Sequence, residues 1–215
     1  MTRHVSVAVL ALLATVFVIE VPLIAQTPKD WRLRVDRSTS ASDPDAAGDI
    51  KFTTMGTGFH ATSPKAAVFW NPANTVAGNY SLQATFTLMS PGAHVEYYGL
   101  VFGGSDLEGS GQNYLYFMVA QDGTWLIKRR DGDASSQNVS AKTPSDVVKK
   151  PDSSGKSTNA LAVRVLADKI EYVVNGTLVH TTPKTGLTAK SDGIYGIRIN
   201  HRLEVHVDGF AVSKQ

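Results

Sequence analysis

The chain has 215 residues, with 21 Lys and Arg against 19 Asp and Glu, a net charge of +2, and no cysteine. The charge is too small, and the cations are too scattered, to indicate a nucleic-acid partner. Without cysteine, thiol chemistry is excluded and no disulfide can form, so stability must come from a packed core.

The first segment has the pattern of a secretory signal. Arg3 and His4 precede an apolar run over residues 5–19, and residues 23–25 resemble a small-residue cleavage site. We expect residues 1–25 to be removed as a signal peptide. The mature protein is then predicted to be periplasmic or secreted.

The alternative for this segment is an uncleaved membrane anchor. Glu20 and Pro22 interrupt the run before the roughly 20 apolar residues that a membrane-spanning helix needs. We therefore expect no membrane span after signal removal. Residues 26–215 are predicted to form one domain that is large enough to bury its own core.

From residue 31 onward, short β-prone runs are separated by Gly, Pro, Asn, Asp and Ser, and no long segment has a helical period. This pattern predicts an all-β fold, a two-sheet antiparallel jelly-roll sandwich. Two polar segments, residues 36–48 and 131–156, are predicted to be surface loops. The predicted strands are residues 31–35, 50–54, 59–62, 67–70, 80–88, 97–102, 114–121, 124–130, 159–165, 169–174, 177–181, 193–199 and 203–212.

The strands on either side of Asp122-Gly123 are expected to form a hairpin. Asp-Gly between two β-prone runs favours a two-residue type I′ turn. That turn would pair Ala120 with Trp125 and Tyr116 with Arg129. One face of the ribbon would then carry Leu115, Phe117, Val119 and Leu126. The other would carry Tyr116, Met118, Trp125, Ile127 and Arg129.

A second tight hairpin is predicted at Asn175-Gly176, where it would pair Val173 with Leu178 and Glu171 with His180. Residues 80–88 alternate apolar and polar side chains, which indicates a strand with one buried face.

Several motifs follow one another in an order that resembles the concanavalin A-like lectin and glucanase jelly-roll superfamily. The order is also similar to laminin-G-like domains and to bacterial domains of the 3-keto-disaccharide hydrolase type. The resemblance covers residues 80–212 and implies two stacked antiparallel sheets, with sugars often bound on the concave one. The motifs are Tyr-Tyr-Gly-Leu-Val-Phe-Gly-Gly at 97–104, Tyr-Leu-Tyr-Phe at 114–117, Asp-Gly-Thr-Trp at 122–125, Leu-Ala-Val-Arg-Val at 161–165, Val-Asn-Gly at 174–176, Asp-Gly-Ile-Tyr-Gly-Ile-Arg at 192–198 and Asp-Gly-Phe at 208–210.

The glucanases of this superfamily carry a Glu-x-Asp-x-x-Glu strand motif, and that motif is absent here. Glu204, His206 and Asp208 alternate along one strand, but i to i+4 is roughly 13 Å. Paired glycosidase carboxylates lie about 5 to 9.5 Å apart. Glu204 and Asp208 are therefore interpreted as polar residues on a solvated strand face.

No cofactor is expected. The glycine-rich segment 103–113 offers oxygen donors at Asp106, Glu108 and Asn113 that could hold a structural calcium ion. The spacing of a calcium-binding EF-hand loop is missing, so turn chemistry is the preferred interpretation.

The hairpin face with Tyr116, Trp125 and Arg129 is the candidate binding surface. Trp70, Tyr98 and Arg198 could join it from neighbouring strands. Aromatic rings stack on the apolar faces of sugars, and guanidinium groups donate to their hydroxyls. The alternative is that loops cover this face and that it only packs.

Three functions follow from these observations. The first is an exported, monomeric module that binds a carbohydrate and has no catalytic apparatus. The second is a glycan-active enzyme akin to 3-keto-disaccharide hydrolases, in which Asp106, Glu108, His201 or Arg198 meet in a groove. The third is a structural envelope module with both faces buried against partners.

Overall fold

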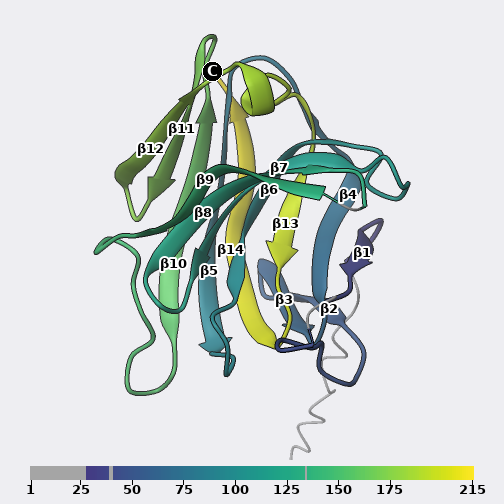
Figure 1. Cartoon of the computed structure of the whole chain (residues 1–215), viewed down its shortest axis with the longest axis vertical. Helices are drawn as coiled ribbons and strands as arrows, with labels where there is room; N and C mark the ends of the chain where they lie inside the picture. Colours follow the sequence, from purple (N-terminus) through teal and green to yellow (C-terminus); the bar gives the residue numbers. More distant parts are fainter. Residues whose placement is uncertain (1–27, 39–40, 134) are drawn as a thin grey trace, which may run out of the picture.

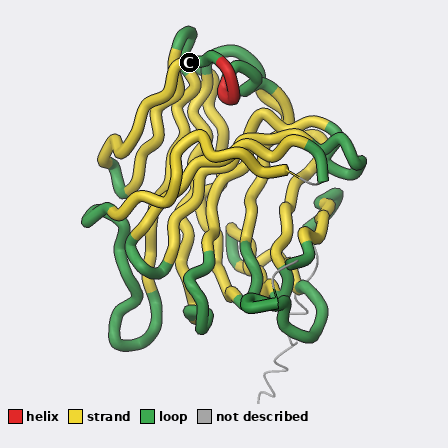
Figure 2. The backbone as a smooth tube through the Cα atoms, viewed as in Figure 1, coloured by secondary structure: helices red, strands yellow, loops and turns green. Residues whose placement is uncertain are grey.

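The computed structural model describes residues 28–38, 41–133 and 135–215, so the predicted signal peptide lies outside the described residues. Two antiparallel sheets of seven strands each pack face to face (Figure 1). A short 3₁₀ turn, η1 (Gly186–Thr188), is the one helical element within the described part of the chain (Figure 2). The predicted all-β jelly-roll sandwich is confirmed.

We call the two sheets the first sheet and the second sheet, and their strands are given in the order in which they pair. The first sheet is β1 (Arg32–Asp36), β4 (Ala66–Val76), β13 (Gly193–Ile199), β6 (Tyr97–Ser105), β7 (Asn113–Ala120), β8 (Thr124–Asp131) and β9 (Ser135–Pro144). The second sheet is β12 (Thr177–Pro183), β11 (Lys169–Val174), β10 (Ser157–Val165), β5 (Tyr80–Ser90), β14 (Leu203–Lys214), β3 (Gly58–Ser63) and β2 (Lys51–Met55). Among the described residues, no helix is long and apolar enough to cross a membrane.

The core lies between the sheets and follows from side-chain alternation. On β5, Tyr80, Leu82 and Phe86 are fully buried, whereas the intervening polar side chains are not, as the sequence predicted. Phe117 of β7 meets Tyr172 of β11 with ring centroids 5.3 Å apart, which joins the two sheets across the core.

One strand, β9, was missed by the sequence prediction, because residues 131–156 were assigned to a loop. Its sequence has no apolar alternation that would indicate a strand. It forms at the edge of the first sheet through backbone pairing with β8, and its register shifts twice. Pairing to a formed neighbour, rather than burial of its own side chains, therefore makes this segment a strand.

The predicted tight hairpin at Asn175-Gly176 is confirmed, and its turn is type I′, since φ is 49° at Asn175 and 82° at Gly176. Val173 pairs with Leu178, as expected. The expected pairing of Glu171 with His180 is wrong, because a bulge between Tyr172 and Val173 shifts the register. Glu171 instead pairs with Thr181.

The register predicted for the β7–β8 hairpin is wrong by one residue. Val119 pairs with Trp125, and Tyr116 pairs with Lys128 rather than with Arg129. Gly123 has a φ of 86°, but Asp122 does not have the positive φ that a type I′ turn requires.

The turn instead spans residues 120–123. The Gly123 N–H donates to the Ala120 carbonyl oxygen at 3.1 Å. Asp122 Oδ1 accepts from the backbone N–H of Thr124 at 3.1 Å and from its hydroxyl at 2.6 Å. This is a type I turn followed by a glycine bulge, and it lengthens the loop by one residue.

The shift moves Trp125 into the core. Successive strand residues point to opposite faces, so a one-residue shift exchanges the faces of a whole strand. Trp125 is 4% exposed and lies 5.3 Å from the ring of His180 on the second sheet. Leu126 and Lys128 share the outer face with Tyr116.

Trp125→Ala should therefore behave as a core truncation. We expect the free energy of unfolding to fall by about 3–5 kcal/mol, because the change leaves a cavity between the sheets. Urea denaturation followed by circular dichroism measures this loss. Leu178→Ala is the control, since Leu178 is 51% exposed, and its effect should be within about 0.5 kcal/mol. Equal stability of the two variants would contradict the observed register.

Candidate functional site

The structure brings three of the six predicted binding residues to one surface. Trp70, Tyr116 and Arg198 lie on the outer face of the first sheet, away from the second sheet. Tyr98 and Trp125 are buried in the core between the sheets. The shelf that was expected to combine Tyr116, Trp125 and Arg129 is therefore not formed.

Arg129 points to the core side of β8, where it is 6% exposed. It donates to the carbonyl oxygen of Lys190 at 2.7 Å and to the side-chain oxygen of Asn113. These contacts join β8 to the segment that precedes β13. Arg129 is thus a structural tie rather than part of the outer face.

Two adjoining cavities, of about 650 and 370 Å³, open on the outer face, and we call them together the outer groove. Arg130, Arg198 and Asn200 line both cavities. The larger also includes Arg34, Asp36, Asp133 and His201. The smaller also includes Asp43, Glu96, Tyr97, Tyr116, Leu126 and Lys128. Both volumes fall in the range of small-molecule sites.

The floor of the outer groove is apolar, but it is mostly covered. Tyr116 and Leu126, which line the smaller cavity, are 5% and 6% exposed. The guanidinium carbon of Arg198 lies 5.3 Å from the centroid of the Tyr116 ring, a cation–π arrangement. A ligand in the groove would therefore meet polar groups before it met aromatic faces.

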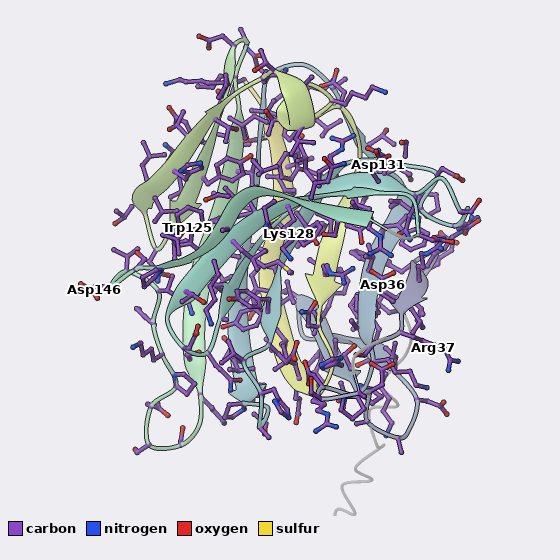
Figure 3. The ribbon with its side chains drawn as sticks, viewed as in Figure 1. Asp36, Arg37, Trp125, Lys128, Asp131 and Asp146 are labelled. Carbon is purple, nitrogen blue, oxygen red and sulfur yellow. The ribbon has the colours of Figure 1, made fainter. Side chains whose placement is uncertain are left out.

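Asp36 of β1 is the centre of the charged groups. It accepts from Arg198 of β13 and lies 3.4 Å from Nη2 of Arg130 on β8. Arg198 also donates to the hydroxyl of Tyr114 at 2.8 Å. Burial favours the neutral form of Asp36, but the guanidinium groups of Arg198, Arg130 and Arg34 outweigh this and lower its pKa. In Figure 3, Asp36 lies toward β1, at one edge of the first sheet, whereas Lys128 lies on β8, next to the strand at the opposite edge.

Arg34 holds the rim of the groove. It donates to the carbonyl oxygens of Glu108 at 2.8 Å and Gly109 at 2.7 Å, and it contacts the carboxylate of Asp133. Arg130 donates to the carbonyl oxygen of Asp133 at 2.7 Å. Two loops are thereby fixed beside the larger cavity.

The three oxygen donors considered for calcium do not converge. Asp106 accepts from the backbone N–H of Gly111 at 3.1 Å, and Glu108 forms an ion pair with Arg32. Asn113 donates to Asp131 at 2.9 Å. Each of the three side chains serves a different local contact.

Three buried polar atoms beside the outer groove have no hydrogen-bond partner among the described residues. They are Nε of Arg130, Nε of Arg198 and Oδ1 of Asn200. Buried polar groups in folded proteins nearly always have a partner. These three atoms are themselves shielded from solvent, so a molecule in the groove would meet other parts of these side chains, which are 17% exposed for Arg130 and 10% exposed for Arg198.

Asp43, Glu96 and His201 meet at the end of the groove. Nε2 of His201 lies 2.8 Å from Oε1 of Glu96 and 3.1 Å from Oδ2 of Asp43. Burial raises the pKa of Glu96, with His201 opposing and Asp43 adding to this shift. For Asp43, desolvation is outweighed by contact with His201, and its pKa is lowered.

Sequence reasoning missed this cluster because its members are distant in the chain. Asp43 precedes β2, Glu96 directly precedes β6, and His201 lies in the turn between β13 and β14. No spacing rule links such positions. Within the described part of the chain, no other set of three His, Asp or Glu side chains is close enough to share a metal ion.

The residues considered for a hydrolase are only partly brought together. Arg198 and His201 line the larger cavity, whereas Asp106 and Glu108 do not. Glu204 lies on the second sheet, where it pairs with His60 at 3.1 Å. This placement agrees with its interpretation as part of a strand face.

No family model and no curated protein matches the sequence. Solved structures do match. The carbohydrate-binding module CBM66 from Bacillus subtilis is 14% identical, with a TM-score of 0.59, covering 77% of this chain and 92% of that one. A Bacillus subtilis protein of unknown function with a galectin-like fold is 16% identical, with a TM-score of 0.57, covering 86% of this chain and 90% of that one.

A family 7 alginate lyase, A1-II′, is 11% identical, with a TM-score of 0.53, covering 86% of this chain and 95% of that one. Binding modules and enzymes thus share this architecture, and the likeness establishes the fold rather than the activity. The chain has the concanavalin A-like lectin and glucanase jelly-roll fold.

Proposed function

We propose that this protein is an exported carbohydrate-binding module and that it holds its ligand in the outer groove. The observation that carries the proposal is a groove on one sheet whose two cavities share the polar residues Arg130, Arg198 and Asn200. Sugar hydroxyls both donate and accept hydrogen bonds, so this class of ligand suits a groove lined by cationic donors and by amide and carboxylate acceptors. The likeness in fold to a carbohydrate-binding module supports this choice.

The groove is also built to stay rigid. Its cations stand on strands of one sheet, and Asp36 holds two of them in place. Preorganised polar groups lose little conformational entropy on binding. Tyr97 and Leu126 also line the smaller cavity, and they are 9% and 6% exposed, so the polar side chains rather than the aromatic faces would contribute most of the contacts.

Export is supported by the first residues of the chain. A positive start, an apolar run and a small-residue site stand in the order of a secretory signal. A cysteine-free chain needs no oxidising compartment to fold. We propose the periplasm or the medium as its location.

A glycan-active hydrolase is the second candidate. It is favoured by Glu96, whose pKa is raised by burial, standing beside His201 at the groove. Such a pair can exchange a proton with a bound sugar. The structural envelope module is the third candidate, and it requires a protein partner over the groove.

Lys128→Ala tests the binding function. Lys128 lines the smaller cavity, and the described residues give it no ion pair. We expect at least a tenfold loss of affinity for the best ligand from a panel of neutral and acidic oligosaccharides, because a charged donor is worth about 1.5–3 kcal/mol. Isothermal titration calorimetry measures the affinity.

Lys51→Ala is the matched control, because Lys51 is exposed on the second sheet. This variant should bind the same oligosaccharide with the affinity of the wild type. Failure of the wild-type protein to retain any panel member would overturn the binding proposal. If chromatography detected shortened products of a panel oligosaccharide, the hydrolase would become the preferred function. A stable complex with another protein on size-exclusion chromatography would instead support the envelope module.

Asp36→Asn tests what holds the groove together. The change leaves Arg198, which is 9% exposed, without its counter-charge, so we expect the free energy of unfolding to fall by about 3–5 kcal/mol at pH 7. In the wild type, the contribution of Asp36 is fully present above its ordinary pKa of 3.8 and is lost as the pH falls through the lowered value of the folded state.

Thermal unfolding between pH 2 and pH 7 measures both effects. Asp146→Asn is the control, because Asp146 is exposed and its loss should leave the pH profile unchanged. If Asp36→Asn kept the acid sensitivity of the wild type in full, Asp36 would not be the source of that sensitivity.

A further inference from the structure

The cluster of Asp43, Glu96 and His201 presents three ligand atoms to one point. The three atoms lie within 4.8 Å of one another. Glu96 is 3% exposed, and the His201 side chain is 9% exposed. An imidazole and a carboxylate are therefore both removed from water and lie side by side.

Asp45 lies beside the cluster and determines the tautomer of His201. Nδ1 of His201 lies 3.2 Å from Oδ1 of Asp45. An ionised carboxylate only accepts hydrogen bonds, so Nδ1 carries the proton. In the neutral imidazole, Nε2 then presents its lone pair to Glu96 and Asp43.

That arrangement is unfavourable without a positive charge between the atoms. Nε2 of His201 has no hydrogen-bond partner of suitable geometry in the described part of the chain, although two carboxylate oxygens lie within 3.1 Å of it. Three lone pairs that face one another, two of them on side chains removed from water, repel. A proton or a metal ion must therefore occupy the space.

We propose that Asp43, Glu96 and His201 bind a divalent transition cation, with Zn²⁺ as the preferred ion. One imidazole nitrogen and two carboxylate oxygens match the ligands that zinc accepts. Asp45 supplies the carboxylate that orients a metal-bound histidine through its second nitrogen.

The three proposed ligands border the outer groove. Asp43 and Glu96 line the smaller cavity, and His201 lines the larger one. Three protein ligands with one open position is the arrangement of zinc sites that bind water or an added molecule. The metal proposal stands on its own contacts and does not require the groove to hold a sugar.

Zinc binding by the untagged mature protein, stripped with EDTA, provides the test. We expect one Zn²⁺ per chain by calorimetry and by elemental analysis, with a rise in melting temperature. Glu96→Gln should lower the affinity at least 100-fold. Asp45→Asn, which removes only the orienting carboxylate, should lower it 10- to 100-fold. The double variant Glu204→Gln with His206→Asn removes a histidine and a carboxylate from the other sheet, and its affinity should match the wild type.

Cobalt substitution is measured on the wild-type protein, so its result does not depend on how well a variant folds. Co²⁺ bound to the wild type should show the visible absorption of a nitrogen- and oxygen-ligated ion, and Zn²⁺ should abolish it. Binding of Ca²⁺ or Mg²⁺ but not of Zn²⁺ would overturn the assignment to a transition cation. If the wild type bound no metal, and Glu96→Gln raised the melting temperature, the cluster would be a proton-sharing network instead.

Discussion

The turn at residues 120–123 determines which side chains occupy each face of the first sheet. Asp122 accepts from Thr124 and Gly123 takes the positive φ, so the loop contains one residue more than a type I′ turn allows. The side-chain period of a strand is two, and this single residue sends Trp125 into the core and Lys128 to the outer face. The outer groove has its present lining because of this register.

Charge compensation is the second constraint on this face. Asp36 reaches from β1 across β4 to Arg198 of β13 and also approaches Arg130 of β8. A guanidinium as buried as that of Arg198 is tolerated only with a close counter-charge and hydrogen bonds. One carboxylate thus positions two of the four arginines that line the groove, and it joins the edge strand to the middle of the sheet.

The outer groove joins two kinds of chemistry at one place. Its middle has cations over an aromatic floor, with Arg198 lying against Tyr116. Its end has the acidic group of Asp43 and Glu96 around His201. The cations at the middle and the carboxylates at the end would orient a polar ligand along the groove, and a metal cation held at His201 would reduce that difference in charge. The architecture is shared by binding modules and by a lyase, so the function of this chain depends on these side chains.

The sequence by itself determined the sandwich, because apolar alternation on strands such as β5 and the positive-φ turn at Asn175-Gly176 are local properties. It also predicted Tyr116, Trp70 and Arg198 as candidates for one surface, and the structure places these three on the same face of the first sheet. Tertiary structure alone decided the rest. Strand β9 forms through pairing with a neighbour, and the Asp43, Glu96 and His201 cluster joins three loops that meet only when the two sheets close. The β7–β8 register is different, because the hydrogen bond between Asp122 and Thr124 that accompanies it is local, although the Asp-Gly pattern favours another turn.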